Sequence, residues 1–107
     1  MSDLVKKLAT GKHAVAAQAY KTAEEFKSAL DRGFVLIKFT ETRGGTELGV
    51  RLDPSKTDLS KGEFQSARGD IRIVGNLILD YVKVSMVADI SLQNLKGNGH
   101  LEILDGK

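Results

Sequence analysis

The polar residues that could contact a ligand gather at two points of the sequence. The first is Arg43-Gly44-Gly45-Thr46, where two glycines let successive backbone amides point at one anion, while Arg43 adds a bidentate donor and Thr46 a hydroxyl. The spacing is neither that of a Walker loop nor that of a GxGxxG fingerprint. A hairpin turn explains the segment more simply, since Gly-Gly is common in hairpins. These four residues are therefore candidate ligand contacts at a predicted turn.

The second point is Asp80-Tyr81, which separates two apolar runs. A carboxylate between such runs is costly unless it is paired or marks an exposed turn, and Lys83 is close enough in sequence to be a partner. The simpler interpretation is a bend that exposes Asp80 to water. Asp80, Tyr81 and Lys83 complete the set of candidate ligand contacts.

Other catalytic and metal-binding chemistry has little support. The chain has no cysteine, so disulfides, thiol nucleophiles and cysteine zinc sites are excluded. Its two histidines, His13 and His100, show no ligand spacing such as HxxxH. Adjacent Glu24 and Glu25 would point about 100° apart on a helix, so they cannot form a facing acid pair. We predict no catalytic residue, no metal and no cofactor, which favours a function other than catalysis.

Length and charge predict one domain with an uneven distribution of lysine. A chain of 107 residues fits a single domain spanning residues 1–107. Within residues 1–21, four lysines stand against the single acidic residue Asp3. We interpret residues 1–21 as a basic arm, whose order the sequence leaves open, and residues 22–107 as the folded core. No run reaches the length of about 20 apolar residues that a membrane span needs, so we expect a cytoplasmic protein that does not associate with membranes.

The clearest helix signal is Thr22-Ala23-Glu24-Glu25, which has the form of a capping box. It predicts a helix from Ala23 to about Asp31 that ends at Gly33. A shorter helix is expected to run from residue 3 to residue 8 or 9, whereas the segment 14–20 fits no pattern. Strands are expected at 34–39, 48–52, 71–79, 81–92 and 101–104.

The strand patterns fix which residues face the core. Apolar residues are odd-numbered before Asp80 and even-numbered after it, a change that requires a turn or bulge there. The run 34–39 is apolar throughout and suggests a strand covered on both faces. Gly97-Asn98-Gly99 suggests a tight turn. We therefore predict an α+β fold, with N-terminal helical segments packed on a mostly antiparallel sheet of about five strands.

Together these features favour a non-catalytic binding or regulatory module that acts through its sheet face or edge on a protein partner or a small ligand. Because the edges of an open sheet need a cover, we expect a homodimer. One alternative is a nucleic-acid-binding protein that uses the basic arm and sheet residues, although no aromatic ladder accompanies these residues. Another is a small α+β enzyme with a pocket between helix and sheet, where Arg43, Asp80 or Tyr81 would be the polar groups. The basic residues of the nucleic-acid alternative are Lys6, Lys7, Lys12, Lys38, Arg51, Arg72 and Lys83.

Overall fold

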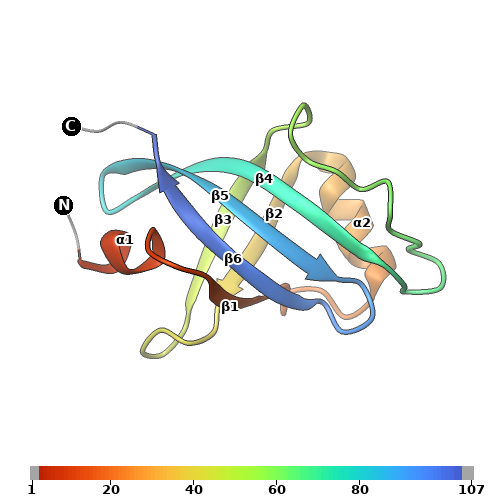
Figure 1. Cartoon of the computed structure of the whole chain (residues 1–107). Helices are drawn as coiled ribbons and strands as arrows, with labels where there is room; N and C mark the ends of the chain where they lie inside the picture. The colour runs from red at the N-terminus through yellow and green to blue at the C-terminus, as the bar shows by residue number, and fades with distance from the viewer. Residues whose placement is uncertain (1–2, 105–107) are drawn as a thin grey trace.

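The computed structural model describes residues 3–104, which form six strands and two short helices (Figure 1). In chain order the elements are α1 (Asp3–Leu8), β1 (His13–Ala16), α2 (Ala23–Arg32), β2 (Phe34–Phe39), β3 (Thr46–Leu52), β4 (Asp70–Leu79), β5 (Val82–Ser91) and β6 (Lys96–Ile103).

The six strands form a closed antiparallel barrel in the order β1-β2-β3-β4-β5-β6. The predicted α+β fold, with helices packed on an open sheet of about five strands, is therefore wrong. The barrel closes because β1 pairs with β6 on one side and with β2 on the other. A closed sheet leaves far fewer free edges than the open one that we expected.

The strand that closes the barrel is the one that the sequence did not reveal. β1 is His13-Ala14-Val15-Ala16, four residues in which alanine masks the alternation of polar and apolar positions. Val15 is buried and lies opposite both Phe39 of β2 and Gly97 of β6. Opposite β1, β6 carries Gly97 and Gly99, and a Cβ on Gly99 would lie 3.3 Å from Val15 Cγ1. Small residues therefore let β1 and β6 approach each other, a signal that depends on side-chain size and not on hydropathy.

The barrel interior is packed with apolar side chains from alternate positions of the strands. On β5 the even-numbered residues face inward, and on β4 the odd-numbered ones do, so the predicted change of parity is confirmed. It occurs at a two-residue turn in which Asp80 and Tyr81 both have positive φ, 50° and 67°, the sign that a type I′ turn requires. The largest fully buried strand residues include Ile37, Phe39, Ile71, Ile73, Met86, Ile90 and Leu101.

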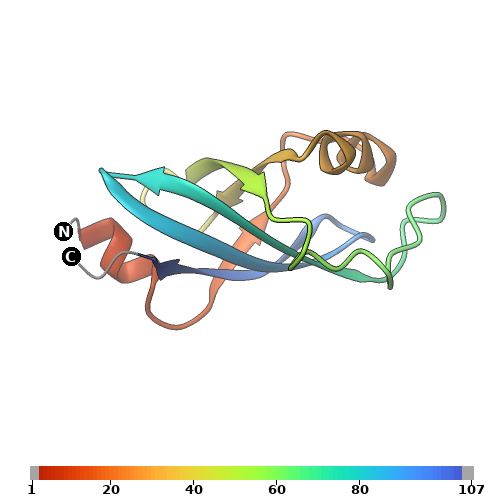
Figure 2. The ribbon, with the colours of Figure 1, turned by 90° about the horizontal axis from the view of Figure 1, so that it is seen from above.

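The two helices lie at opposite ends of the barrel (Figure 2). α1 buries Val5 and Leu8 in the core, and α2 buries Phe26 and Leu30. Tyr20 stacks on Phe26 with ring centroids 5.2 Å apart, and its hydroxyl accepts a hydrogen bond from the Leu36 amide. The described part of the basic segment 1–21 thus contributes a helix and a strand to the fold.

The predicted capping of α2 is confirmed. The Thr22 hydroxyl accepts a hydrogen bond from the Glu25 amide at 3.0 Å, and Gly33 ends the helix with φ of 82°. The Glu25 carboxylate reaches back one residue further than expected, because it accepts from the Lys21 amide at 2.9 Å.

Two local expectations in the sheet are wrong. β2 is covered on one face only, since Phe34 is 51% exposed while Val35 is fully buried. Gly97 and Gly99 belong to β6, and the turn before that strand is formed by residues 92–95. Gly97 is small for a packing reason, because a Cβ there would collide with the Asp89 carbonyl oxygen of the neighbouring strand.

Candidate functional site

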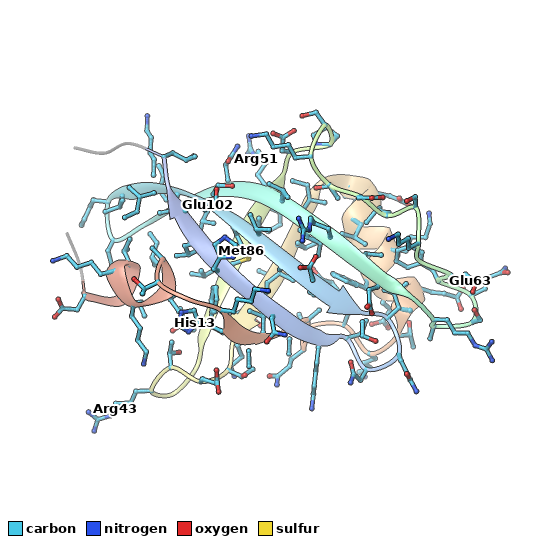
Figure 3. All side chains as sticks on the ribbon, in the orientation of Figure 1. His13, Arg43, Arg51, Glu63, Met86 and Glu102 are labelled. Atoms are coloured by element: carbon cyan, nitrogen blue, oxygen red, sulfur yellow. The ribbon has the colours of Figure 1, made fainter. Side chains whose placement is uncertain are left out.

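The first group of sequence-predicted site residues forms the turn between β2 and β3. Gly44 and Gly45 have φ of 73° and 75°, and the Gly45 amide donates to the Thr42 carbonyl at 2.8 Å. The Thr46 hydroxyl is engaged with that of Thr42 at 2.7 Å. Arg43 is exposed and projects away from the barrel (Figure 3). The glycines therefore serve the turn, and Arg43 carries the exposed charged side chain of these four residues.

The second group lies at the turn between β4 and β5. Asp80 is exposed, the Tyr81 side chain is completely exposed, and Lys83 lies on the outer face opposite Ile78. Among residues 3–104, no hydrogen bond or ion pair joins this turn to the first one. The structure does not gather the seven predicted residues into one site, and their role in binding stays a prediction.

A groove on the outer surface of β4, β5 and β6 brings polar side chains together more closely. We call it the outer groove. Its volume is about 460 Å³. It is lined by Lys12, Lys56, Arg72, Val74, Ser85, Val87, Asp89, Asn98, Gly99, His100 and Glu102.

The antiparallel register builds the floor of the outer groove. Residues on the outer faces of the three strands stand directly opposite one another, so each cross-strand row contributes one residue per strand. Val74 and Ser85 are 8% and 7% exposed, which makes the centre of the floor partly apolar and partly hydroxylic. The three rows are Arg72–Asp89–Asn98, Val74–Val87–His100 and Asn76–Ser85–Glu102.

One ion pair and one contact between a histidine and a carboxylate lie within the outer groove. Arg72 binds Asp89 through two hydrogen bonds, Nε to Oδ1 at 2.9 Å and Nη2 to Oδ2 at 3.1 Å. This bidentate contact, helped by the nearby charge of Asp58, raises the pKa of Arg72. His100 Nε2 lies 3.0 Å from Glu102 Oε2. Both carboxylates of the groove therefore already have a partner.

Two lysines at the rims of the outer groove have no such partner. Lys56 lies in the connection between β3 and β4, and Lys12 precedes β1 on the other side. Both are exposed, and neither makes an ion pair with a residue of the described part of the chain. The charge of Asp53 does act on Lys56. The lining of the outer groove holds three cations, Lys12, Lys56 and Arg72, against the two acids Asp89 and Glu102, and this excess of positive charge attracts anions.

Hydrogen bonds between Thr57 and Val74 hold the loop that carries Lys56 against β4. The Thr57 hydroxyl donates to the Val74 carbonyl at 2.9 Å and accepts from the Val74 amide at 3.1 Å. The Asp53 carboxylate accepts from the hydroxyl and the amide of Ser55, and these bonds lower its pKa. The loop that carries Lys56 is therefore positioned before any ligand arrives.

From the sequence, Arg72 was predicted only as one residue of a basic sheet face, and His100 only as a surface residue. The outward positions of β4 and β5 follow from their alternation, which the sequence does show. The partner across each row depends on the register, and Lys12 and Lys56 reach the groove through loops. No pattern of residue types encodes either of these placements.

Five surface pockets formed by residues 3–104 can be compared with the predicted enzyme pocket. None of them is lined by Arg43, Asp80 or Tyr81, so the structure gives no support to a catalytic pocket at those residues. No model of a known protein family matches the sequence, and no match to it was found among curated proteins.

Proposed function

We propose that this chain is a non-catalytic binding module and that its outer groove binds a small, negatively charged ligand. The observation that carries the proposal is the charge arrangement: the three cations Lys12, Lys56 and Arg72 line the groove against two acids, Asp89 and Glu102. Lys12 and Lys56 lie at opposite rims and make no ion pair within residues 3–104. A ligand with two separated anionic groups would neutralise both lysines at once.

The size and floor of the outer groove support a small molecule in preference to a protein partner. A volume of about 460 Å³ falls in the range of about 300 to 1,000 Å³ typical of small-molecule sites. Val74 and Val87 supply apolar contact area, while Ser85, Asn98 and His100 supply hydrogen-bonding groups. The packed barrel interior, by contrast, presents only buried apolar side chains.

The same groove gives little support to catalysis or to base recognition. Within the described residues, His100 contacts Glu102 and makes no hydrogen bond to Ser85, so no nucleophile stands against a base. The lining contains no Phe, Tyr or Trp on which a nucleotide base could stack. These features favour the binding module over the enzyme and nucleic-acid alternatives.

Location and assembly complete the proposal. Among residues 3–104 no helix is both long and apolar enough to cross a membrane. We propose a cytoplasmic location, which suits a chain without cysteine. The homodimer expected from the sequence stays part of the proposal.

Nuclear magnetic resonance titration of the amide signals tests the ligand class, with inorganic phosphate and citrate as probes at an ionic strength of about 0.15 M, where the Debye length is about 8 Å. We expect saturable shifts at Ser85, Val87 and His100, with citrate binding more tightly because it can reach both lysines. The double variant Lys12→Ala/Lys56→Ala should weaken binding about tenfold or more. Shifts confined to the Arg43–Thr46 turn would contradict the groove and favour the turn.

A matched variant separates a specific site from general attraction of anions. Lys6→Ala/Lys7→Ala removes the same charge from the exposed side of α1, outside the outer groove. We expect it to leave citrate binding within about twofold of the wild type, since exposed charges beyond a Debye length are screened. Equal losses in the two double variants would show that no built site exists.

A further inference from the structure

One cross-strand row of the outer groove carries a cation at each end. Its inner members stand directly opposite one another on adjacent strands, Val74 opposite Val87 and Val87 opposite His100. The strands that carry them, β4, β5 and β6, lie side by side on one face of the barrel (Figure 1). We call the five groove-lining residues Lys56, Val74, Val87, His100 and Lys12 the middle row.

Lys12 stands at the β6 end of the middle row because of the register between β1 and β6. His13 pairs with Gly99, and in an antiparallel ladder the preceding residue of one strand lies beside the following residue of the other. Continuing this register by one residue places Lys12 beside His100. Lys12 is exposed, so its charge is available at this end of the row.

Lys56 stands at the other end because its loop is fixed to β4. The hydroxyl of the next residue, Thr57, donates to the Val74 carbonyl at 2.9 Å and accepts from the Val74 amide at 3.1 Å. One residue further, the Asp58 amide donates to the Arg72 carbonyl at 2.8 Å, and the Arg72 amide donates back at 2.9 Å. Two successive attachments therefore hold Lys56 at the rim beside Val74.

The acids of the groove lie in the two neighbouring rows. Asp89 accepts both hydrogen bonds of the Arg72 guanidinium, which stands opposite it on β4. Glu102 stands opposite Ser85, and one of its oxygens lies 3.0 Å from His100 Nε2. The middle row itself contains no carboxylate. A ligand that lies along it meets a lysine at each end and passes between two acids that already have contacts.

The floor between the two lysines is apolar and has a definite length. Val74 is 8% exposed and Val87 is partly buried, so a hydrocarbon chain above them would be removed from water. Val74 and His100 lie two strand spacings apart, which is about 10 Å. An extended dicarboxylate of eight carbons spans about 9 Å between its carboxyl carbons. Its ends would lie within reach of the two flexible lysine side chains.

We propose that the outer groove selects linear dicarboxylates of about eight carbons, which lie along the middle row with one carboxylate at each lysine. The inference rests on the proposed function and deepens it, because it specifies the spacing of the anionic groups and the apolar chain between them. A shorter diacid reaches both lysines only when their side chains bend inward over the floor. A longer diacid must bend away from the floor.

A series of dicarboxylates tests the spacing. Isothermal titration calorimetry at neutral pH and an ionic strength of about 0.15 M would compare succinate, adipate, suberate and sebacate, the even-numbered acids from four to ten carbons. We expect affinity to peak at suberate and to be about fivefold lower for succinate. Octanoate, which has the chain length of suberate and one carboxylate, should bind about tenfold more weakly. Affinity that is flat, or that rises steadily with chain length, would overturn the inference.

Single lysine variants test whether each carboxylate meets its own lysine. In Lys12→Ala and in Lys56→Ala, suberate should bind at most about twofold more tightly than octanoate, because only one carboxylate then has a partner. Lys6→Ala/Lys7→Ala is the control and should keep the wild-type preference for suberate. A wild-type preference in either single variant would overturn the placement of the two carboxylates.

Val87→Thr tests the apolar floor with little change in side-chain shape. The hydroxyl should weaken suberate binding about threefold and leave citrate binding within about twofold of the wild type. Ile78→Thr makes a similar change at an outer position of β4 that is 66% exposed and outside the groove, and it should not affect suberate. Circular dichroism checks that both variants are folded. Undiminished suberate binding by Val87→Thr, or equal losses in the two variants, would overturn the contact with the floor.

Failure of this inference is distinguishable from failure of the proposed function. Saturable binding of phosphate and citrate in the groove, without any preference among the diacids, would keep the anion site and overturn only the spacing. No binding by any of these anions would overturn both.

Discussion

β4 has two neighbours in the barrel, and it pairs with them very differently. It forms ten residue pairs with β5, from Asp70↔Ser91 to Leu79↔Val82, but only two with β3. A two-residue turn joins β4 to β5, whereas the connection from β3 occupies residues 53–69. The tight turn fixes register along the whole ladder, while the long connection lets the strands diverge beyond Asn76.

The two sides of β4 therefore hold their neighbouring side chains in place to different extents. The complete ladder holds rows of outer side chains in fixed positions, and the outer groove lies on these rows. The short ladder joins β3 to β4 only at Arg51↔Asn76 and Leu52↔Gly75, so fewer cross-strand contacts fix side chains on that side. Regular pairing suits a site that must hold several side chains in fixed positions.

The largest expected effect is on the free energy of unfolding. It compares a side chain inside the complete β4–β5 ladder with one beyond the short β3–β4 ladder. Met86 is fully buried on β5, and truncation to alanine should lower the free energy of unfolding by about 2 to 5 kcal/mol. Leu77 lies on β4 beyond the last pair with β3 and is only partly buried, so Leu77→Ala should lower the free energy of unfolding by about 1 kcal/mol. Urea denaturation measures both. Equal losses would show that the surroundings of Leu77 are packed as tightly as those of Met86.

A smaller effect concerns the turn that creates the ladder. Tyr81 has φ of 67° and a completely exposed side chain, so its backbone is strained and side-chain packing does not offset the strain. Tyr81→Gly should raise the free energy of unfolding by about 0.5 to 1 kcal/mol, because glycine adopts positive φ freely. Tyr81→Ala removes the same ring but keeps the strain, and its stability should not rise. A gain in both variants would assign the effect to the ring.

The smallest effect concerns the long connection on the other side of β4. The Asp58 carboxylate accepts hydrogen bonds from the hydroxyl of Ser60 at 2.6 Å and from its amide at 2.9 Å, and these bonds lower the pKa of Asp58. Ser60→Ala removes the larger cause, so the pKa of Asp58 should move back toward 3.8. Carbon-detected titration of the carboxyl group measures the change.

The sign of the pH dependence follows from the lowered pKa. Stabilisation by Asp58 is present above the unfolded value near 3.8 and is lost as the pH falls through the lower folded value. The acid limb of wild-type stability should therefore lie at lower pH than that of Ser60→Ala. Ser66→Ala is the control, because the Ser66 hydroxyl contacts a backbone carbonyl and no carboxylate. Identical acid limbs for Ser60→Ala and the wild type would contradict this role of Ser60.

Local signals in the sequence were sufficient for the helices and for most strands. Thr22 and Gly33 marked the ends of α2 because capping depends on groups within a few residues. The change of parity at Asp80 located the turn between β4 and β5 because side chains alternate along any strand. β1 escaped notice because His13-Ala14-Val15-Ala16 is too short and too small to show alternation.

The candidate site was predictable only in part. The two turns proposed from Arg43 and Asp80 exist, but the outer groove depends on which residues stand opposite one another on three strands. Lys12 and Lys56 reach its rims from separate loops and lie 44 positions apart in the sequence. Their approach is a property of the closed barrel.

The sequence by itself determined where chain segments turn and which face of each strand is apolar, because these properties arise between near neighbours. The tertiary structure alone decided that the sheet closes through β1, that the pairing of β4 with β3 ends at Asn76, and that Lys12 and Lys56 flank one groove. Each of these depends on contacts between residues far apart in the chain, where register and side-chain size decide which strands can approach.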